Sequence, residues 1–373
     1  MKFVVSSTAL FGRIQAISKV INSKNTLPIL DSFLFEIENN TLTITASDTE
    51  TRMVTSLEIV ESESDFRFCI NAKTMLDSMK EISEQPLTFD INPDTMEIQA
   101  QYQNGRFSIM GQNANEYPEA QAAPEANKLT LSAESLLKGI NYCLFATADD
   151  ELRPIMNGIY VDISTEDVTF VSSDGQKLVR NKVLNAHGDS KCAFILPKKP
   201  AALLKNILPK ESGDIEVKFN ERSAVIIMSD YTLSCRLIEG RYPNYNMVIP
   251  QNNPYSAIID RLHLLGALKR VLIFSSQSSS LIKLSLDNNT LVVSGQDVDF
   301  STSAEEKIAC SYSGNAFKIG FNGTYLYDIL NNLNCTDVTI ELADPSRAGV
   351  VVPTEQAENE NTLMLLVPLM LNE

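Results

Sequence analysis

The sequence of 373 residues repeats one plan three times. In the first copy, apolar residues at positions 33, 35 and 37 alternate with polar ones, which predicts a half-buried strand after an extended run at Pro28. Asn39 and Asn40 then predict a tight turn, because Asn tolerates left-handed backbone conformations. A second predicted strand follows and ends at Asp48.

The other two copies keep this spacing. Asp174 lies 126 positions after Asp48, and Asp297 lies 249 positions after it. Stretches of linker composition, at 111–128 and 240–256, separate the copies. The repeat therefore predicts three tandem domains, at 1–120, 127–246 and 253–373.

Helical spacing of apolar residues predicts two amphipathic helices in each copy. The first helix is expected around residues 10–21, 136–144 and 264–272. The second is expected around residues 75–82, 203–208 and 326–333. Together with the alternating strands, this pattern predicts an α+β fold in which two helices of each copy pack on antiparallel sheets.

The charge distribution has two interpretations. The formal net charge of −16 argues against a nucleic-acid partner, because phosphate contacts need Lys and Arg. However, three stretches carry basic residues and no acid at all, namely 1–30, 190–210 and 261–286. One interpretation is an acidic body with one basic face, and the other is three chance gaps among the acidic residues.

No pattern indicates catalysis, a metal or a cofactor. His187 and His263 lack partners at metal-ligand spacing, and no glycine-rich phosphate loop is present. Asp48, Asp174 and Asp297 recur once per copy, which favours a role in a turn over an active site built from unlike groups. We therefore expect no catalytic residue, no bound metal and no cofactor.

The six cysteines are scattered without paired spacing, which predicts reduced thiols. No apolar run is long enough for a membrane span. The first fifteen residues carry few charges and become polar by position 6, so they do not resemble a signal peptide. The expected location is the cytoplasm.

Residues 363–371 are almost unbroken in their apolar character. A buried last strand explains the part up to Val367. Pro368 should end that strand, because proline cannot donate a ladder hydrogen bond. Exposed Leu and Met beside a proline favour an adaptable surface that binds an apolar peptide.

Four segments resemble a known family: LPIL at 27–30, SSDGQKL at 172–178, EGRYPNYNMVIP at 239–250 and VPLML at 367–371. With the triplication, the whole chain resembles the bacterial sliding clamps, the beta subunits of DNA polymerase III holoenzymes. The resemblance implies three tandem DNA-clamp domains and a homodimeric head-to-tail ring around duplex DNA. It also implies a non-catalytic processivity factor that tethers the replicative DNA polymerase, and partners that include the clamp loader and other clamp-binding peptides.

Simple geometry agrees with a ring of two chains. A domain of this length has a radius of gyration of roughly 14 Å, hence a diameter of about 35 Å. Three touching spheres of that size leave a hole ~5 Å wide, while six leave one ~35 Å wide. Since a DNA duplex is roughly 20 Å across, two chains can encircle it and one cannot.

The resemblance implies functional residues at matching positions. The DNA-facing residues would be Lys24, Lys73, Arg153, Lys198 and Lys199. The dimer interface would contain Arg106, Phe107, Ile109, Ile273, Phe274, Glu305 and Glu306. The peptide-binding cleft would contain Met156, Ser173, Gly175, Gln176, Lys177, Leu178, Pro243, Met247, Val248, Leu365, Val367, Pro368, Leu369 and Met370. Within this cleft, Gln176-Lys177 replaces a frequent His-Arg pair, and Met247 and Met370 stand where Arg is common.

Two alternatives remain open at the level of the sequence. The first is a repeat-built scaffold that binds peptides and has no role on DNA. The second is an enzyme, such as a metal-dependent nuclease at Asp174. Retention on circular DNA distinguishes the first alternative from a clamp, and metal-dependent turnover of DNA would be needed to support the second.

Overall fold

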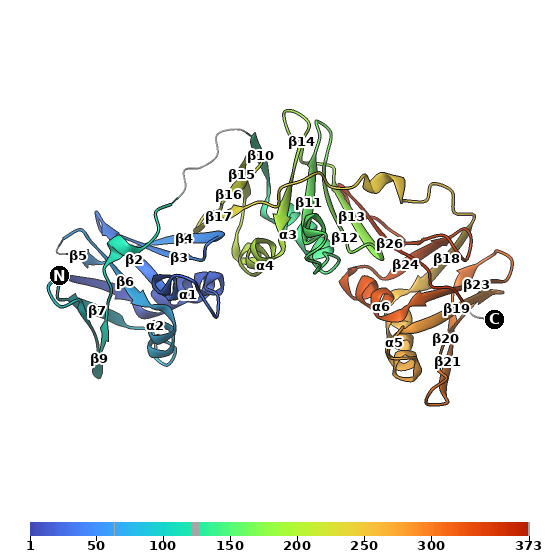
Figure 1. The fold of residues 1–373 in the computed structure, drawn as a ribbon, viewed down its shortest axis with the longest axis horizontal. Coiled ribbons are helices and arrows are strands. Elements are labelled where there is room, and N and C mark those ends of the chain that lie inside the picture. The colour runs from blue at the N-terminus through green and yellow to red at the C-terminus, as the bar shows by residue number, and fades with distance from the viewer. Residues whose placement is uncertain (63, 121–126, 372–373) are drawn as a thin grey trace. The chain divides into compact units, whose positions relative to one another are not determined.

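The computed structural model describes residues 1–62, 64–120 and 127–371 (Figure 1). Parts of the predicted first linker, 121–126, and of the predicted third domain, 372–373, lie outside the described residues. The chain forms two compact units. The first consists of Met1–Glu134 and Ala202–Leu237, and the second of Ser135–Ala201 and Ile238–Glu373.

Each helix begins directly after a strand. The α-helices are α1 (Ser7–Ile17), α2 (Ala72–Met79), α3 (Ala133–Leu144), α4 (Lys198–Ile207), α5 (Arg261–Val271) and α6 (Gly323–Asn332). Polar N-cap residues explain four of these starts, because their side-chain oxygens accept the backbone N–H of the residue three positions on: Ser6, Asn71, Asp260 and Asn322. An N-cap of this kind contributes about 1 kcal/mol. The predicted helices are present, although α1 ends at Ile17 and continues as a 3-10 turn, η1 (Ser18–Val20).

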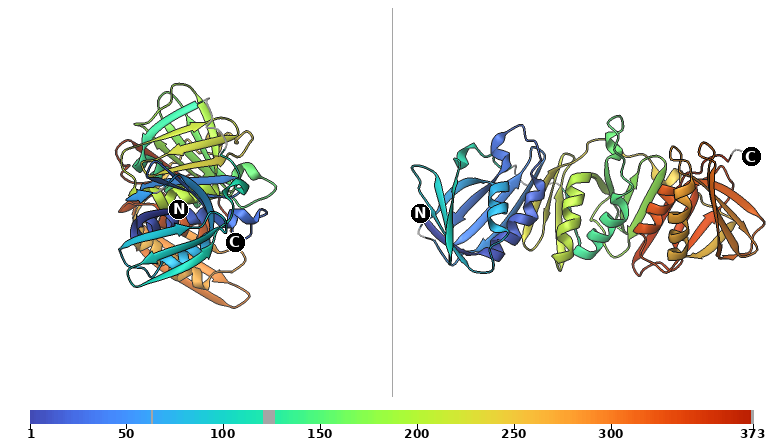
Figure 2. Two further views of the ribbon diagram at one scale, coloured as in Figure 1. Left: turned by 90° about the vertical axis from the view of Figure 1, so that its left-hand side faces the viewer. Right: turned by 90° about the horizontal axis from the view of Figure 1, so that it is seen from below.

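The first unit contains two antiparallel sheets. The five-stranded sheet has the order β5 (Glu61–Ser62), β1 (Lys2–Ser6), β7 (Pro86–Ile91), β8 (Glu97–Tyr102), β9 (Gly105–Met110). The eight-stranded sheet has the order β10 (Asn127–Ser132), β15 (Asp214–Phe219), β16 (Ser223–Ile227), β17 (Tyr231–Arg236), β4 (Thr51–Glu58), β3 (Thr41–Ser47), β2 (Ser32–Glu38), β6 (Phe66–Asn71). Helices α1 and α2 lie side by side (Figure 2), and buried phenylalanines such as Phe3 and Phe68 fill the core between helices and sheets.

The second unit is built in the same way. Its nine-stranded sheet has the order β14 (Cys192–Pro197), β11 (Gly158–Ile163), β12 (Val168–Ser173), β13 (Lys177–Val183), β26 (Glu360–Leu366), β25 (Gly349–Pro353), β24 (Asp337–Leu342), β18 (Tyr255–Asp260), β22 (Ser311–Tyr312). Its four-stranded sheet has the order β21 (Thr302–Ala309), β20 (Thr290–Asp297), β19 (Leu281–Asp287), β23 (Phe317–Asn322). Helices α5 and α6 lie side by side (Figure 2).

The two large sheets cross the boundaries of the sequence repeat. In the first unit, β17 of the second copy pairs with β4 of the first copy. In the second unit, β26 of the third copy pairs with β13 of the second copy over seven residue pairs, from Lys177↔Leu366 to Val183↔Glu360. The compact units therefore do not follow the copies, and the predicted domain limits stay a prediction.

The backbone at the predicted turns confirms the choice of residues. Asn39 and Asn40 have φ values of 49° and 61°, and the equivalent Asn288 and Asn289 have 44° and 60°. The expected extended run at Pro28 was wrong, since Pro28–Asp31 forms a 3-10 turn, η2. Proline fits the first position of a helical turn because its φ is already fixed there and its missing N–H has no partner to lose.

Replacing Gly139 with alanine should destabilise the second unit. Gly139 lies buried in α3, and an added Cβ would approach the Phe170 ring to 2.5 Å. We expect Gly139→Ala to lower the free energy of unfolding by about 1–3 kcal/mol, as overpacking does, measured from the urea midpoint. Gly12→Ala is the control, because Gly12 is exposed in α1 with nothing within 4 Å of the added Cβ, and alanine there should stabilise the helix by up to about 1 kcal/mol. Equal midpoints for the two variants would contradict the packing described.

Candidate functional site

The three repeated aspartates build the same turn. The Oδ1 atom of Asp48 accepts the backbone N–H groups of Glu50 and Thr51 at 2.7 and 2.6 Å. Asp174 Oδ1 accepts those of Gln176 and Lys177 at 2.8 and 2.9 Å. Asp297 makes the equivalent pair of bonds with the residues two and three positions on. The predicted turn role of these aspartates is confirmed.

Residues from the second and third copies share one apolar cluster at the turn of Asp174. Its buried members are Val171, Leu178, Ile195, Tyr242, Tyr245, Ile249 and Leu365. Tyr242 stacks on Tyr160 with ring centroids 4.7 Å apart, and the hydroxyl of Tyr245 donates to Asp162 at 2.9 Å. Burial, followed by the Asp162 carboxylate, raises the pKa of Tyr245, so this hydroxyl stays protonated as the donor.

Four large apolar side chains in the same two segments remain in solvent. Their exposed fractions are 82% for Met247, 55% for Val248, 43% for Val367 and 77% for Met370. Met247 and Val248 belong to segment 239–250, which also supplies Tyr242 and Tyr245 to the cluster. Val367 and Met370 belong to segment 367–371, which begins two positions after Leu365. Exposed apolar residues next to a buried apolar cluster are typical of a surface that binds another protein.

The residues after β26 are held in place by backbone hydrogen bonds. Val367 donates its N–H to the carbonyl oxygen of Gln176 at 2.8 Å, and Leu369 donates to Gly320 at 2.8 Å. Gly320 and Leu369 also form an isolated β-bridge. Strand β26 ends at Leu366, as the proline at 368 predicts, but the chain continues as an ordered strip between the second and third copies.

Gly175 and Arg153 lie together on one side of the Asp174 turn. Gly175 has a φ of 93°, which favours glycine, and a Cβ there would lie 2.9 Å from Arg153 Nη1. Arg153 also donates to the backbone oxygen of Asp174 at 3.3 Å and to the carboxylate of Asp150 at 2.8 Å. The hydrogen bond from Arg153 lowers the pKa of Asp150. The structure therefore places Arg153, predicted to face DNA, beside the predicted peptide-binding residues.

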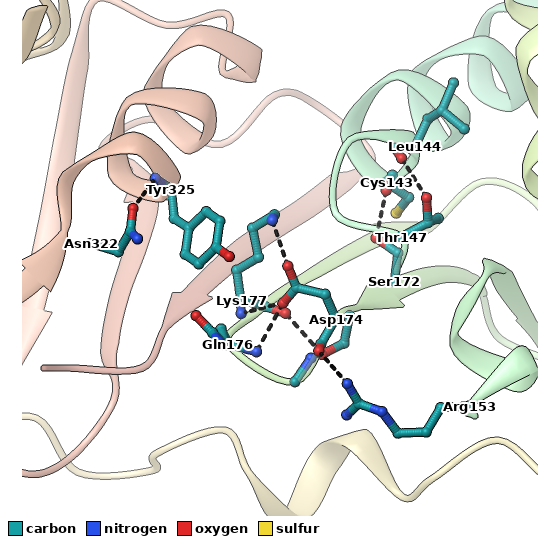
Figure 3. Close-up of polar contacts among 12 residues, drawn as sticks. Cys143, Leu144, Thr147, Arg153, Ser172, Asp174, Gln176, Lys177, Asn322 and Tyr325 are labelled. Atoms are coloured by element: carbon teal, nitrogen blue, oxygen red, sulfur yellow. Dashed lines mark hydrogen bonds and ion pairs between the residues drawn. The ribbon is translucent and has the colours of Figure 1, made fainter. Parts of the chain in front are cut away.

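Lys177 turns its side chain away from solvent (Figure 3). Its Nζ lies 2.6 Å from Asp174 Oδ2 and 4.1 Å from the centroid of the Tyr325 ring. Tyr325 belongs to the first turn of α6, where its N–H is bonded to the cap residue Asn322 at 3.1 Å. In contrast, the side chain of Gln176 is exposed. Of the predicted cleft residues, Lys177, Leu178, Met156, Ser173 and Leu365 are buried.

The other predicted DNA-facing residues lie on both units. Lys24 is exposed in the loop before η2, and Lys73 is exposed in the first turn of α2. Lys198 and Lys199 begin α4, and Lys198 forms an ion pair of 3.7 Å with Asp149. Asp149 is the neighbour of Asp150, so one acidic loop supplies partners to both Lys198 and Arg153.

Five of the seven predicted dimer residues lie on two edge strands, and the other two lie in a 3-10 turn. Strand β9, with Arg106, Phe107 and Ile109, is the last strand of the five-stranded sheet. Strand β21, with Glu305 and Glu306, is the last strand of the four-stranded sheet. Ile273 and Phe274 follow α5 in the 3-10 turn η7 (Leu272–Phe274), 75% and 40% exposed. Glu306 already binds Arg270 of the same chain through two hydrogen bonds of 2.6 and 2.7 Å.

Sequence reasoning missed Tyr325, Asp150 and Gly320. Tyr325 and Gly320 lie far from their partners in the sequence, so no spacing or motif marked them. Asp150 lies only three positions from its partner Arg153, but it belongs to an acidic run that is typical of a solvated loop. One signal was available for Lys177, because the 126-residue offset aligns this lysine with Thr51 in a turn whose Ser-Asp pair is repeated.

The described residues hold no cluster of metal ligands, and two of the cysteines are buried thiols with a raised pKa. None of their His, Cys, Asp and Glu side chains gather in groups of three or more that could hold a metal ion. All six cysteines are free, and burial raises the pKa of Cys69 and of Cys235 to about 12, so these thiols are not nucleophiles at neutral pH. In the same described part of the chain, no helix is long and apolar enough to cross a membrane.

Repeated two-helix, two-sheet domains with an apolar surface between two copies define a DNA-clamp type of protein. Comparisons with known sequences identify the family. Three models of the DNA polymerase III beta subunit match in order: the N-terminal domain at residues 1–121, the central domain at 130–244 and the C-terminal domain at 246–367. The chain belongs to the bacterial DNA polymerase III beta subunit family.

Curated relatives agree over the full length. The beta sliding clamp of Synechococcus elongatus is 28% identical over 364 residues, covering 95% of this chain and 96% of its own. The beta sliding clamp of Pseudomonas aeruginosa is 23% identical over 372 residues, covering 100% of both chains. The chain is thus a DNA sliding clamp that tethers the polymerase, and it is a processivity factor rather than an enzyme.

Solved structures have the same fold. The sliding clamp of Pseudomonas aeruginosa bound to griselimycin superimposes with a TM-score of 0.94 at 22% identity, covering 100% of both chains. The DNA polymerase III beta subunit of Thermotoga maritima gives a TM-score of 0.91, also at 22% identity and complete coverage.

Removing Arg270 should raise the pKa of Glu306. The hydrogen bonds from Arg270 lower the pKa of this carboxyl group in the folded chain. The contribution of the pair to stability is therefore present above the unfolded carboxyl pKa of about 4.3 and is lost as the pH falls through the lower folded value. We expect Arg270→Gln to return the pKa of Glu306 toward its ordinary value, measured by carbon-detected NMR titration. A Lys269→Gln variant serves as the charge-matched control, and an unchanged pKa in Arg270→Gln would contradict the ion pair.

Proposed function

We propose that two copies of this chain close head to tail into a ring that encircles duplex DNA. The observation that carries this proposal is the pair of edge strands β9 and β21, each with one neighbour among the described strands. The two edges differ in sequence, and a contact between unlike surfaces closes a ring of two when each chain offers both. The apolar residues Phe107 and Ile109 would meet Ile273 and Phe274, and Arg106 would approach Glu305, the exposed acid of the pair on β21.

The inside of this ring would hold DNA through cations that contact phosphates rather than bases. Lys24, Lys73, Arg153, Lys198 and Lys199 are the residues assigned to this surface. Phosphate contacts carry no sequence information, so they suit a ring that moves along the duplex. The acidic residues elsewhere, which give the chain its net charge of −16, would repel DNA from the outer surface.

The apolar surface between the second and third copies would bind peptide segments of the replicative polymerase, the clamp loader and other DNA-processing proteins. We assign to it the cleft residues identified from the sequence, with Met247, Val248, Val367 and Met370 as the exposed apolar contacts. Griselimycin, which is bound to the clamp of Pseudomonas aeruginosa, is a suitable probe of this surface. The proposed ring works on chromosomal DNA, hence in the cytoplasm.

Retention on circular DNA tests the ring. A dimer of two 41.3 kDa chains, 82.6 kDa in total, is reassembled from monomers in the presence of nicked circular DNA. We expect gel filtration in high salt to keep the protein with the circle, because enclosure does not depend on phosphate contacts that salt weakens. Linearising the circle should release it.

A closure variant supplies the control for this experiment. Ile273→Glu puts a charge on an exposed apolar residue of the proposed interface, so the chain should fold and stay monomeric by light scattering. A wild-type monomer, or binding that is the same on circular and linear DNA, would contradict the ring and favour a peptide-binding scaffold.

Met370→Ala should weaken the binding of griselimycin. Met370 is 77% exposed, so its truncation removes contact area without disturbing the core. We expect a loss of about 1–2 kcal/mol, as for a truncated anchor residue, measured by isothermal titration calorimetry. Leu262→Ala is the matched control, because Leu262 is 62% exposed on α5 and lies outside the proposed surface. Equal affinities for both variants would argue against the assignment of Met370.

A further inference from the structure

The turns at Asp48 and at Asp174 are built alike but differ in one buried residue. Ser47 and Ser173 donate their hydroxyls to the backbone oxygens of Thr51 and Lys177, at 3.2 and 2.8 Å. Both positions are buried, with exposed fractions of 4% for Thr51 and 6% for Lys177. A threonine is therefore sufficient to build this turn, and the buried charge of Lys177 needs another reason.

The contacts of Lys177 supply that reason. A buried ammonium group is costly unless it is paired, and Lys177 is paired with Asp174 on its own turn. Its second contact is the ring of Tyr325, which belongs to the third copy (Figure 3). An ammonium group over an aromatic ring is attracted most strongly where water is excluded. Lys177 also acts on Asp328, one turn further along α6: burial raises the pKa of this carboxyl, and the nearby ammonium partly opposes that rise.

Lys177 thus connects the same two copies that hold the strip after β26. One end of the strip is bonded to the carbonyl of Gln176, next to Lys177 in the sequence. The other end is bonded to Gly320 in β23, the strand that leads directly into α6 and Tyr325. Any change in the distance between the Asp174 turn and α6 would therefore move the two anchors of the strip.

We propose that Lys177 is a positioning residue for the peptide-binding surface. It connects the turn at 174–178 to α6 through the Tyr325 ring and keeps the strip at 367–370 in its binding conformation. The inference rests on the proposed function, since the surface in question is the proposed peptide site. A strip that is already ordered loses little further conformational entropy when a ligand binds. Lys177 contributes to affinity in this way without its buried side chain touching the ligand.

Substitutions taken from the chain itself test this role. Lys177→Thr copies the turn of the first copy, and we expect it to raise the Kd for griselimycin about tenfold. The amide protons of Val367 and Leu369 should exchange faster in the same variant. Lys177→Arg keeps a cation over the ring, and Tyr325→Phe keeps the ring itself, so both should stay within about twofold of the wild type.

A double-mutant cycle separates positioning from simple damage. Tyr325→Leu leaves the residues of the Asp174 turn unchanged. On its own, it should speed hydrogen exchange at the Leu369 amide, as Lys177→Thr should. In the Lys177→Thr background, Tyr325→Leu should cause no further loss of griselimycin affinity, because both substitutions remove the same contact between Lys177 and Tyr325. Additive losses of affinity would overturn the proposal, and so would unchanged exchange at Leu369 in either single variant.

The binding data also distinguish this inference from the function on which it rests. If the wild-type chain fails to bind griselimycin, the proposed peptide surface is wrong, and the positioning role falls with it. If the wild type binds and Lys177→Thr binds equally well, the positioning role is wrong and the proposed function stands.

Discussion

Antiparallel pairing across the repeat boundaries is the constraint on which this structure depends. The last strand of one copy completes the sheet of the copy before it, as β17 does with β4 and β26 with β13. Since backbone hydrogen bonds in a ladder have to be made in register, each pairing fixes how the following residues leave the sheet. Arg236 donates its N–H to the carbonyl of Glu50 at 2.9 Å, and Val367 makes the equivalent bond to Gln176. The chain therefore leaves the large sheet with the same backbone hydrogen bond in each compact unit.

The two equivalent junctions between copies differ in their side chains. Arg52 occupies the position that corresponds to Leu178, again 126 residues apart. Its guanidinium donates to the carbonyl oxygen of Pro118 at 2.8 Å and lies 5.8 Å from the centroid of the Tyr117 ring, and burial lowers its pKa. Arg52 thus covers the ring of Tyr117, whereas Leu178 packs with Tyr242 in the apolar cluster below exposed methionines. One backbone plan gives a closed polar junction in the first unit and an open apolar surface in the second.

Much of the fold could be predicted because it depends on local chemistry. The asparagine turns, the aspartate turns and most of the helices follow from residues within a few positions of one another. Pro28 was misjudged because proline fits both extended runs and helical turns, and only the surrounding structure decides. The burial of Lys177 and the pairing of Glu306 with Arg270 depend on residues 148 and 36 positions away, which a single sequence does not relate to them. The candidate surface was predicted from its motifs, while the contact of Lys177 with Tyr325 was not predicted.

The partners of the basic residues bear on how a clamp holds DNA. Arg153 is bonded to Asp150, and Lys198 lies near Asp149, so each of these two proposed DNA contacts has a carboxylate beside it. Each cation neutralised in this way contributes less to counterion release, and the salt-dependent part of the affinity falls with it. Strong phosphate contacts would slow movement along the duplex, whereas a closed ring needs none of them to stay on the DNA. In the proposed ring, weak local electrostatics at Arg153 and Lys198 would therefore complement enclosure of the DNA.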